Sequence, residues 1–106
     1  MIIADRSLSQ GDAEVLDFEC DANKSAANVR KHRVSFEEAE SAFEDPNCLR
    51  GYDLKHAEFE ERWLLLGCSS RHRLLAVSYT RRNEKIRIIS ARRANQAEKR
   101  RYTDEA

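Results

Sequence analysis

Cysteine is scarce in this sequence, and its spacing argues against two small-domain frameworks. The three cysteines are Cys20, Cys48 and Cys68, an odd number with no CxxC pair. Disulfide scaffolds and zinc ribbons both need closely spaced pairs. A metal site drawing on Cys20, His32, Cys48, His56 or Cys68 stays open as the weaker alternative. We expect the cysteines instead to be small, buried apolar side chains.

Long apolar runs are also missing. No run reaches the roughly 18 apolar residues that a membrane-spanning helix needs, so no membrane span is expected. The opening MIIADRSLSQ has neither a basic head nor a long apolar stretch, so we expect no signal peptide and a cytoplasmic protein. The 106 residues fit one compact domain, which we place at residues 15–106 after a flexible extension over residues 1–14.

An excess of charge of one sign is the third absence, because 19 Lys and Arg balance 19 Asp and Glu. The charges are nevertheless segregated along the chain. Residues 1–61 hold 7 basic and 15 acidic side chains, whereas residues 62–106 hold 12 basic and 4 acidic ones. A chain polarised in this way can present a local surface that attracts anions. Ordinary solvated faces would explain the same distribution, so charge alone does not decide.

Hydrophobic periodicity predicts an α+β domain. The expected elements are a strand at 15–20, helices at 21–32 and 35–45, strands at 48–53, 62–68, 73–80 and 85–91, and a helix at 95–102. Asp21 is a good N-cap for the first helix. Ser35 with Glu38, and Asn95 with Glu98, form capping boxes at the other helix starts.

Short loops join the last three expected strands, so we predict that they run antiparallel. One face of this sheet would pack on the two N-terminal helices. The other face would be free for chemistry or for a partner.

Arginines on these strands are candidates for contact with phosphate. Arg87 lies between two isoleucines in mid-strand and therefore points away from them. The candidate surface comprises Arg62, Tyr79, Arg87, Ser90 and Arg92, although a bulge near residues 88–89 would change the sorting. Arginine forks match phosphate oxygens, and tyrosine can stack on a base. Solvated arginines on an ordinary sheet are the alternative interpretation.

Candidates for proton transfer are fewer. His32 lies at the end of the first helix, where the helix dipole favours its protonated form. His56 lies in an expected loop, and Glu61 adjoins the first strand arginine. Lys24 and Lys31 are further cations of the first helix. A lone histidine is more often a surface or capping residue than a catalyst.

An ordered series of residues resembles the BrnT family of toxins. Its opening comprises Phe18-Glu19-Cys20-Asp21, Lys24, Asn28, Lys31-His32 and Val34 to Ala39. It continues with Phe43, Asp45-Pro46, Asp53, His56, Glu61-Arg62, Gly67, Ser69, Arg73 to Leu75, Tyr79-Thr80, Ile86 to Arg92, Glu98, Arg100 and Tyr102. The resemblance runs from about residue 16 to about residue 103. No single piece is diagnostic, whereas the ordered series is specific.

The resemblance implies a RelE-like fold and the toxin role in a type II toxin–antitoxin pair. It further implies a ribonuclease that uses neither metal nor cofactor and inhibits translation and growth. The implied partner is a cognate BrnA-like antitoxin of the ribbon-helix-helix type, through which alone the toxin would touch DNA. In the implied site Arg62, Arg87 and Arg92 clamp the phosphate, His56 or His32 transfers a proton, and Glu61 orients Arg62 or acts as base. Lys24, Lys31, Tyr79 and Ser90 would position the RNA.

Two positions depart from the family pattern. Cys20 stands where the family usually has tryptophan, which removes a ring that could stack on a base. Arg33 stands where the family usually has glycine, the residue suited to a left-handed helix end. We therefore expect Arg33 to strain that turn by about 1 kcal/mol or to reshape it.

Two other function classes compete with the nuclease hypothesis. The sheet could dock a partner protein without catalysis, as an inactive toxin homologue that only co-represses with its antitoxin. A regulator that binds DNA directly is the weaker rival, because the basic run Lys99-Arg100-Arg101 is short.

Overall fold

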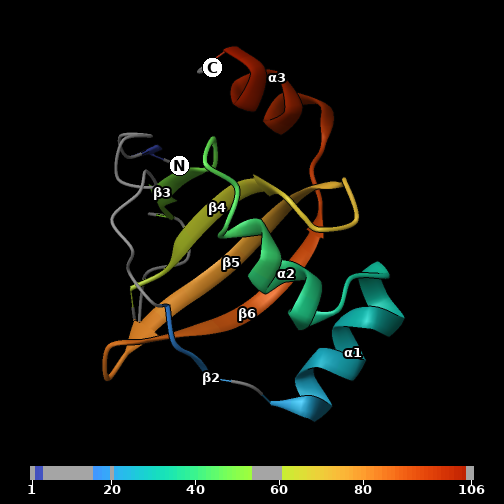
Figure 1. Ribbon diagram of the computed structural model, residues 1–106, viewed down its shortest axis with the longest axis vertical. Coiled ribbons are helices and arrows are strands. Elements are labelled where there is room, and N and C mark those ends of the chain that lie inside the picture. The colour runs from blue at the N-terminus through green and yellow to red at the C-terminus, as the bar shows by residue number, and fades with distance from the viewer. Residues whose placement is uncertain (1, 4–15, 20, 54–60, 105–106) are drawn as a thin grey trace.

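Six strands form one sheet, in the order β1-β3-β4-β5-β6-β2 (Figure 1). The computed structural model describes residues 2–3, 16–19, 21–53 and 61–104. The strands are β1 (Ile2–Ile3), β2 (Phe18–Glu19), β3 (Leu49–Tyr52), β4 (Trp63–Cys68), β5 (Leu74–Arg82) and β6 (Lys85–Arg93). The helices are α1 (Ala22–His32), α2 (Phe36–Ala42) and α3 (Gln96–Asp104). Within the described ranges, no helix is both long and apolar enough to cross a membrane.

Strand pairing is antiparallel except at one edge of the sheet. There β2 pairs in parallel with β6, with Phe18 beside Ile86 and Glu19 beside Arg87. At the opposite edge β1 pairs antiparallel with β3. Strand β1 belongs to the stretch that we expected to be a flexible extension, and residues 4–14 of that stretch lie outside the described residues.

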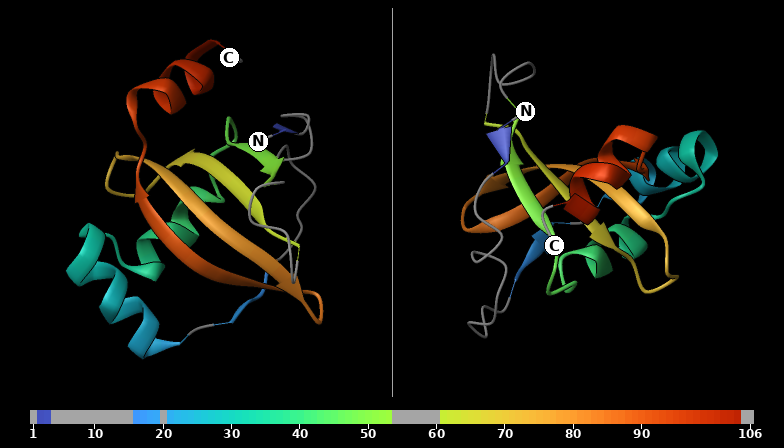
Figure 2. Two further views of the ribbon diagram at one scale, coloured as in Figure 1. Left: turned by 180° about the vertical axis from the view of Figure 1, so that it is seen from behind. Right: turned by 90° about the horizontal axis from the view of Figure 1, so that it is seen from above.

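Two helices cover one face of the sheet, and the third approaches the other face (Figures 1 and 2). The main core lies under α1 and α2 and contains Val34, Phe36, Ala39, Ala42, Phe43, Cys48, Leu65, Leu75, Val77, Tyr79, Ile86, Ile88 and Ala91. A smaller cluster on the other face contains Leu49, Leu66 and Ala76, with Leu64 and Tyr102 packed against it. The predicted α+β class is confirmed. The second face is free only in part, because Tyr102 of α3 packs on it.

Helix α1 begins and ends at the residues that its sequence indicates. The Asp21 carboxylate accepts hydrogen bonds from the backbone N–H groups of Asn23 (3.0 Å) and Lys24 (3.2 Å), which satisfies two donors that the first turn leaves open. At the other end Arg33 adopts the left-handed conformation, with φ 62° and ψ 29°. The expected left-handed helix end is therefore present, and an arginine there costs about 1 kcal/mol relative to glycine.

Helix α2 begins with half of the predicted capping box. Ser35 Oγ accepts from Glu38 N at 3.0 Å as expected. The prediction that the Glu38 carboxylate accepts from the Ser35 backbone N–H is wrong. The buried carboxylate accepts instead from Ser69 Oγ (2.7 Å) and Arg73 Nε (2.9 Å). Arg73 also donates to the Arg33 carbonyl at 3.0 Å. This network joins the end of α1, the start of α2 and the β4–β5 turn.

The β5–β6 hairpin has a tight turn and a bulge. Asn83 and Glu84 both have positive φ, 52° and 64°, which suits a two-residue turn that matches strand twist. Further along, Ser78 pairs with Ser90 while Tyr79 pairs with Ile88. One residue of β6, Ile89, is therefore left over as a β-bulge, at the place where the sequence had left a bulge open.

Helix α3 begins with a complete capping box. The Asn95 side chain accepts from Glu98 N at 2.9 Å, and the Glu98 carboxylate accepts from Asn95 N at 2.8 Å. Near the other end, Tyr102 Oη donates to the Asp45 carboxylate at 2.6 Å. These contacts hold a helix that has no fully buried residue.

Candidate active site

The bulge at Ile89 decides which side chains of β6 share a face. Ile86, Ile88 and Ala91 all lie in the core under α1 and α2. Arg87, Ser90 and Arg92 pair with Thr80, Ser78 and Ala76 of β5, which point to the opposite face, so these three side chains of β6 share that face. In a regular strand, positions 87 and 92 would point to opposite faces. The extra residue is what brings the two arginines to one surface.

Arg62 and Arg87 lie on one row that crosses the sheet. Thr80 of β5 pairs with Arg87, and its hydroxyl donates to the Glu61 carbonyl at 2.5 Å. Continuing the β4–β5 register from the Leu64–Ser78 pair places Arg62 opposite Thr80. The two arginines are therefore two strands apart, about 10 Å between backbones, which their side chains can span toward one phosphate.

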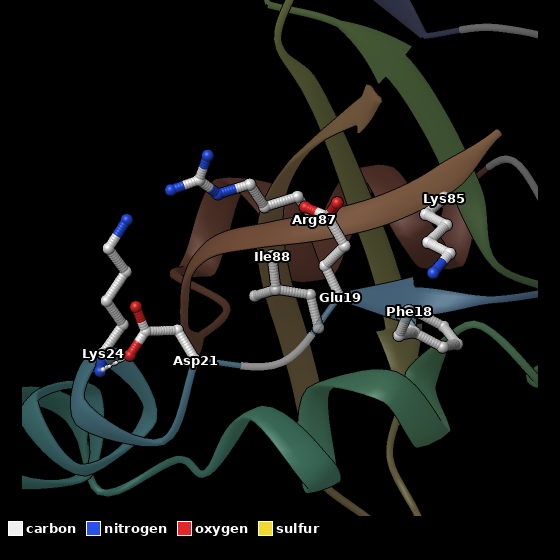
Figure 3. A pocket seen from close by; sticks show the side chains of 7 residues that line it. All are labelled: Phe18, Glu19, Asp21, Lys24, Lys85, Arg87 and Ile88. Carbon is white, nitrogen blue, oxygen red and sulfur yellow. Dashed lines mark hydrogen bonds between the residues drawn. The ribbon is translucent and has the colours of Figure 1, made fainter. Parts of the chain in front are cut away.

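An open groove of about 440 Å³ lies beside Arg87, at the edge where β2 meets β6. It is lined by Phe18, Glu19, Asp21, Lys24, Lys85, Arg87 and Ile88 (Figure 3). Arg87 and Lys24 extend toward the same open space, and Lys85 lies at the first position of β6. Three cations against two carboxylates make the groove attractive to an anion.

The Arg87 side chain is half-buried, and no described residue offers its guanidinium a hydrogen bond or an ion pair. Asp21, by contrast, uses its carboxylate on the backbone of α1. An arginine held in mid-strand without a partner is costly unless its face is wet or a ligand pairs with it. This makes Arg87 the side chain in the groove that is best placed to receive a phosphate.

Arg92 is engaged elsewhere. Its two terminal nitrogens bind the two Glu98 oxygens at 2.7 and 3.0 Å. Burial alone would raise the pKa of Glu98, but the hydrogen bonds from Arg92 and from the Asn95 backbone lower it overall. The same pairing raises the pKa of Arg92. The predicted third arm of the clamp is therefore, in this structure, an anchor for α3.

The remaining predicted residues divide by position. Lys24, Asn28 and Lys31 follow one stripe of α1, and Asn28 turns that stripe toward β6. His32 lies eight residues beyond Lys24, about 12 Å along the helix axis, and does not line the groove. His56 lies outside the described residues, as does Cys20.

Tyr79 is a core residue, which corrects its assignment to RNA contact. Tyr79 alternates regularly with Leu75 and Val77 along β5, so its ring lies on the helix-covered face, where it is 2% exposed and packs edge-on against Phe43 at 5.0 Å between ring centroids. Burial, opposed by nearby arginines such as Arg50, raises the pKa of Tyr79 to about 12. A ring in this position cannot stack on a base.

Asn28 is the structural residue that residue-by-residue reasoning missed. Its amide donates to the carbonyls of Val34 (2.7 Å) and Ala91 (2.8 Å) and accepts from Ala91 N at 3.2 Å. The side chain thus replaces a neighbouring strand at the edge of β6. The signal in the sequence was a polar residue next to two alanines on the helix, which could have indicated a buried side-chain hydrogen bond.

The cysteines differ from one another. Cys48 is fully buried, as expected, whereas Cys68 is exposed, which corrects the expectation for that residue. Among the described residues, no three His, Cys, Asp or Glu side chains come close enough together to hold a metal ion.

Comparison with known proteins points to one family. The family model described as the ribonuclease toxin BrnT of type II toxin–antitoxin systems matches residues 20–98. Among solved structures, the chain is similar to the ribonuclease toxin BrnT of Brucella abortus, with a TM-score of 0.52 and 22% identity. That match covers 77% of this chain and 100% of the other. At this identity the likeness concerns the fold. No curated protein matches the chain.

Proposed function

The chain belongs to the BrnT family of ribonuclease toxins of type II toxin–antitoxin systems, and we propose that it cleaves RNA without a metal ion, with Arg87 holding the scissile phosphate. The observation that carries this assignment is the partly buried Arg87, whose guanidinium has no partner among the described residues and extends beside a groove lined by two lysines (Figure 3). Cellular RNA as the substrate would place its action in the cytoplasm.

The proposed reaction is an attack by the RNA 2′-hydroxyl on the adjacent phosphorus. A base removes the hydroxyl proton, and an acid protonates the departing 5′-oxygen. Negative charge rises on the phosphate oxygens, where Arg87 and Arg62 would hold it from one cross-strand row. Lys24 would contact a neighbouring phosphate, and Ser90 would lie along the same face.

Proton transfer is proposed for Glu61 or His56, with His32 as the more remote candidate. Glu61 is exposed and adjoins Arg62, and its backbone is tied to the strand pair that carries Arg87. His32 is separated from the groove by two turns of α1. Alanine variants at these three positions should lower cleavage in that order if the assignment is right.

An alanine substitution tests the clamp. Arg87→Ala should lower RNA cleavage by about 10²–10³-fold, the usual loss when a donor to a transition-state oxyanion is removed. It should also abolish growth arrest on expression without antitoxin, with little change in Tm. Arg81→Ala is the matched control, because Arg81 is exposed on the neighbouring strand but outside the groove. A fully toxic Arg87→Ala variant would defeat the proposal.

Metal independence and the partner need separate tests. Cleavage by the purified chain should persist in excess EDTA; loss of cleavage that Mg²⁺ restores would contradict it. We propose a BrnA-like, ribbon-helix-helix antitoxin as the neutralising partner, which should copurify with the chain and shift operator DNA. An operator shift by the chain alone would favour the DNA-binding alternative. If expression of the original chain without antitoxin causes no growth arrest, a docking module is favoured.

A further inference from the structure

Two turns that lie far apart in the sequence meet on the surface at the end of α1. The first contains Arg33, and the second is the β4–β5 turn at residues 69–72 (Figure 1). Arg73 joins them, since it donates to the Arg33 carbonyl at 3.0 Å and pairs with the buried Glu38. The Arg73–Glu38 pair therefore fixes the two turns against each other.

The side chains that project from these turns are basic. Lys31, Arg33, Arg71 and His72, here called the basic-turn cluster, are all exposed, and 69% of the Arg71 side chain is accessible. Of the two glutamates at the start of α2, Glu38 is buried and paired with Arg73, so Glu37 is the exposed one. Arg71 Nη1 lies 3.9 Å from Glu38 Oε1, but that carboxylate is buried and already accepts from Ser69 and Arg73. The cluster therefore has three permanent cations, and Glu37 is the exposed carboxylate nearest to Arg33 in the sequence.

Two members of the cluster occupy backbone conformations that favour glycine. Arg33 has φ 62° and His72 has φ 60°. Long or ring-bearing side chains are disfavoured there, and such strain persists where the surrounding structure over-determines the backbone, commonly at functional sites. Here the shared Arg73–Glu38 network supplies that constraint. Basic side chains therefore occupy two positions at which the backbone conformation favours glycine.

The cluster lies about two helical turns along α1 from the Arg87 groove. Lys24 lines the groove, and Lys31 lies seven residues further on the same stripe of α1, about 10 Å along its axis. Resting on the proposed function, we propose that the basic-turn cluster is a second phosphate-binding surface, which holds single-stranded RNA on one side of the cleaved linkage. Contact at this surface lengthens the RNA footprint and is independent of base sequence.

Binding of uncleavable RNA of two lengths tests this surface. RNA bearing 2′-O-methyl groups lacks the attacking hydroxyl, so the full chain can be titrated with a tetranucleotide and with a dodecanucleotide. Arg33→Gly and Arg71→Ala should each weaken dodecanucleotide binding by about threefold or more and reduce the log–log salt slope by about 0.7 per lost contact. Tetranucleotide binding in the groove should stay unchanged.

Two controls separate charge from strain. Arg33→Gly should have a Tm at or above that of the original chain, because glycine relieves the left-handed backbone. Glu84→Gly relieves a similar conformation, φ 64°, without removing a cation, and should not weaken RNA binding. Arg101→Gln removes an exposed cation from α3 and should leave both affinities unchanged.

Three results would overturn the inference: an unchanged dodecanucleotide affinity in both cluster variants, an equal loss for both RNA lengths, or tighter binding of duplex DNA of the same length. The proposed function fails separately. If the original chain leaves ordinary RNA intact while the cluster variants still bind the long RNA less tightly, catalysis is disproved and the binding surface stands.

Discussion

The two halves of β6 carry arginines on the same face, yet the two side chains are in opposite situations. Before the bulge, Arg87 lies beside a groove, and no described residue pairs with its guanidinium. After the bulge, Arg92 is held by both oxygens of Glu98, and the backbone of Ala91 is held by Asn28. Residue type and strand position therefore do not identify a ligand-binding arginine. What distinguishes the two is that a carboxylate holds the Arg92 guanidinium through hydrogen bonds, whereas the neighbouring Glu19 forms no such bond with Arg87.

The largest expected effect comes from removing the anchor of the second half. Asn28→Ala would leave the backbone N–H and C=O of Ala91 and the Val34 carbonyl without their side-chain partner. Buried groups that lose their hydrogen bonds cost about 1–3 kcal/mol each. We expect the free energy of unfolding to fall by about 3 kcal/mol in urea titrations, with the groove half of β6 less affected in hydrogen exchange. A loss below about 0.5 kcal/mol would mean that the strand edge does not depend on this amide.

Breaking the ion pair that holds Arg92 should lower stability by less than Asn28→Ala, and its effect on RNA cleavage tests the role of Arg92. Glu98→Gln keeps an acceptor for the Asn95 backbone while it removes the charge that holds Arg92. A partly exposed pair of this kind contributes about 1 kcal/mol. RNA cleavage should be equal or severalfold higher, because Arg92 becomes available to phosphate. A large loss of cleavage with an intact fold would show that the Arg92–Glu98 pair itself serves the reaction.

The pH dependence of stability follows from the same pair. Burial raises the pKa of Glu98 in the folded chain, but the hydrogen bonds from Arg92 and the Asn95 backbone outweigh it, so the pKa is lowered from its ordinary value of 4.5. Its contribution is therefore present above 4.5 and is lost as the pH falls through the lowered folded pKa. Thermal unfolding of the original chain and of Glu98→Gln should differ at neutral pH and converge as the pH falls below 4.5. A constant difference would contradict this assignment.

The smallest expected effect is at Tyr79. Tyr79→Phe removes only the hydroxyl of a ring packed against Phe43, so stability should change by less than about 1.5 kcal/mol. RNA cleavage should not change, whereas a tyrosine that positions RNA would lower it. Steady-state cleavage rates and the Tm of the same preparation decide between these outcomes.

Much of the fold could be predicted from local signals. Asp21, Asn95 and the hairpin residues act through contacts within a few positions of themselves, so their roles follow from sequence order. The resemblance to BrnT toxins covered the same segments and is supported by the family match over residues 20–98. Glu38 shows the limit of such reasoning. Its local capping role was outweighed by two partners from residues 69–73, which only the folded chain brings near.

Less of the candidate site could be predicted, because it depends on which face each strand residue takes. The sequence left open whether a bulge lies near residues 88–89, and the bulge at Ile89 is what brings Arg92 to the side of Arg87. Tyr79 follows the regular alternation of β5 with Leu75 and Val77, so its ring faces the core. The ion pair of Arg92 with Glu98 depends on how α3 packs against the sheet, and the residues of β6 alone do not predict that packing.

The extra residue in β6, Ile89, determines how the sequence spacing of the two arginines relates to the faces on which they lie. Five positions separate Arg87 from Arg92 in the sequence, but the two arginines pair with Thr80 and Ala76, which are only four positions apart in β5. A relative without the extra residue keeps both arginines on one face when four positions separate them, whereas a relative with a spacing of five needs the bulge. Among relatives with both arginines on this surface, an odd spacing therefore predicts a bulged strand and an even spacing predicts a regular one.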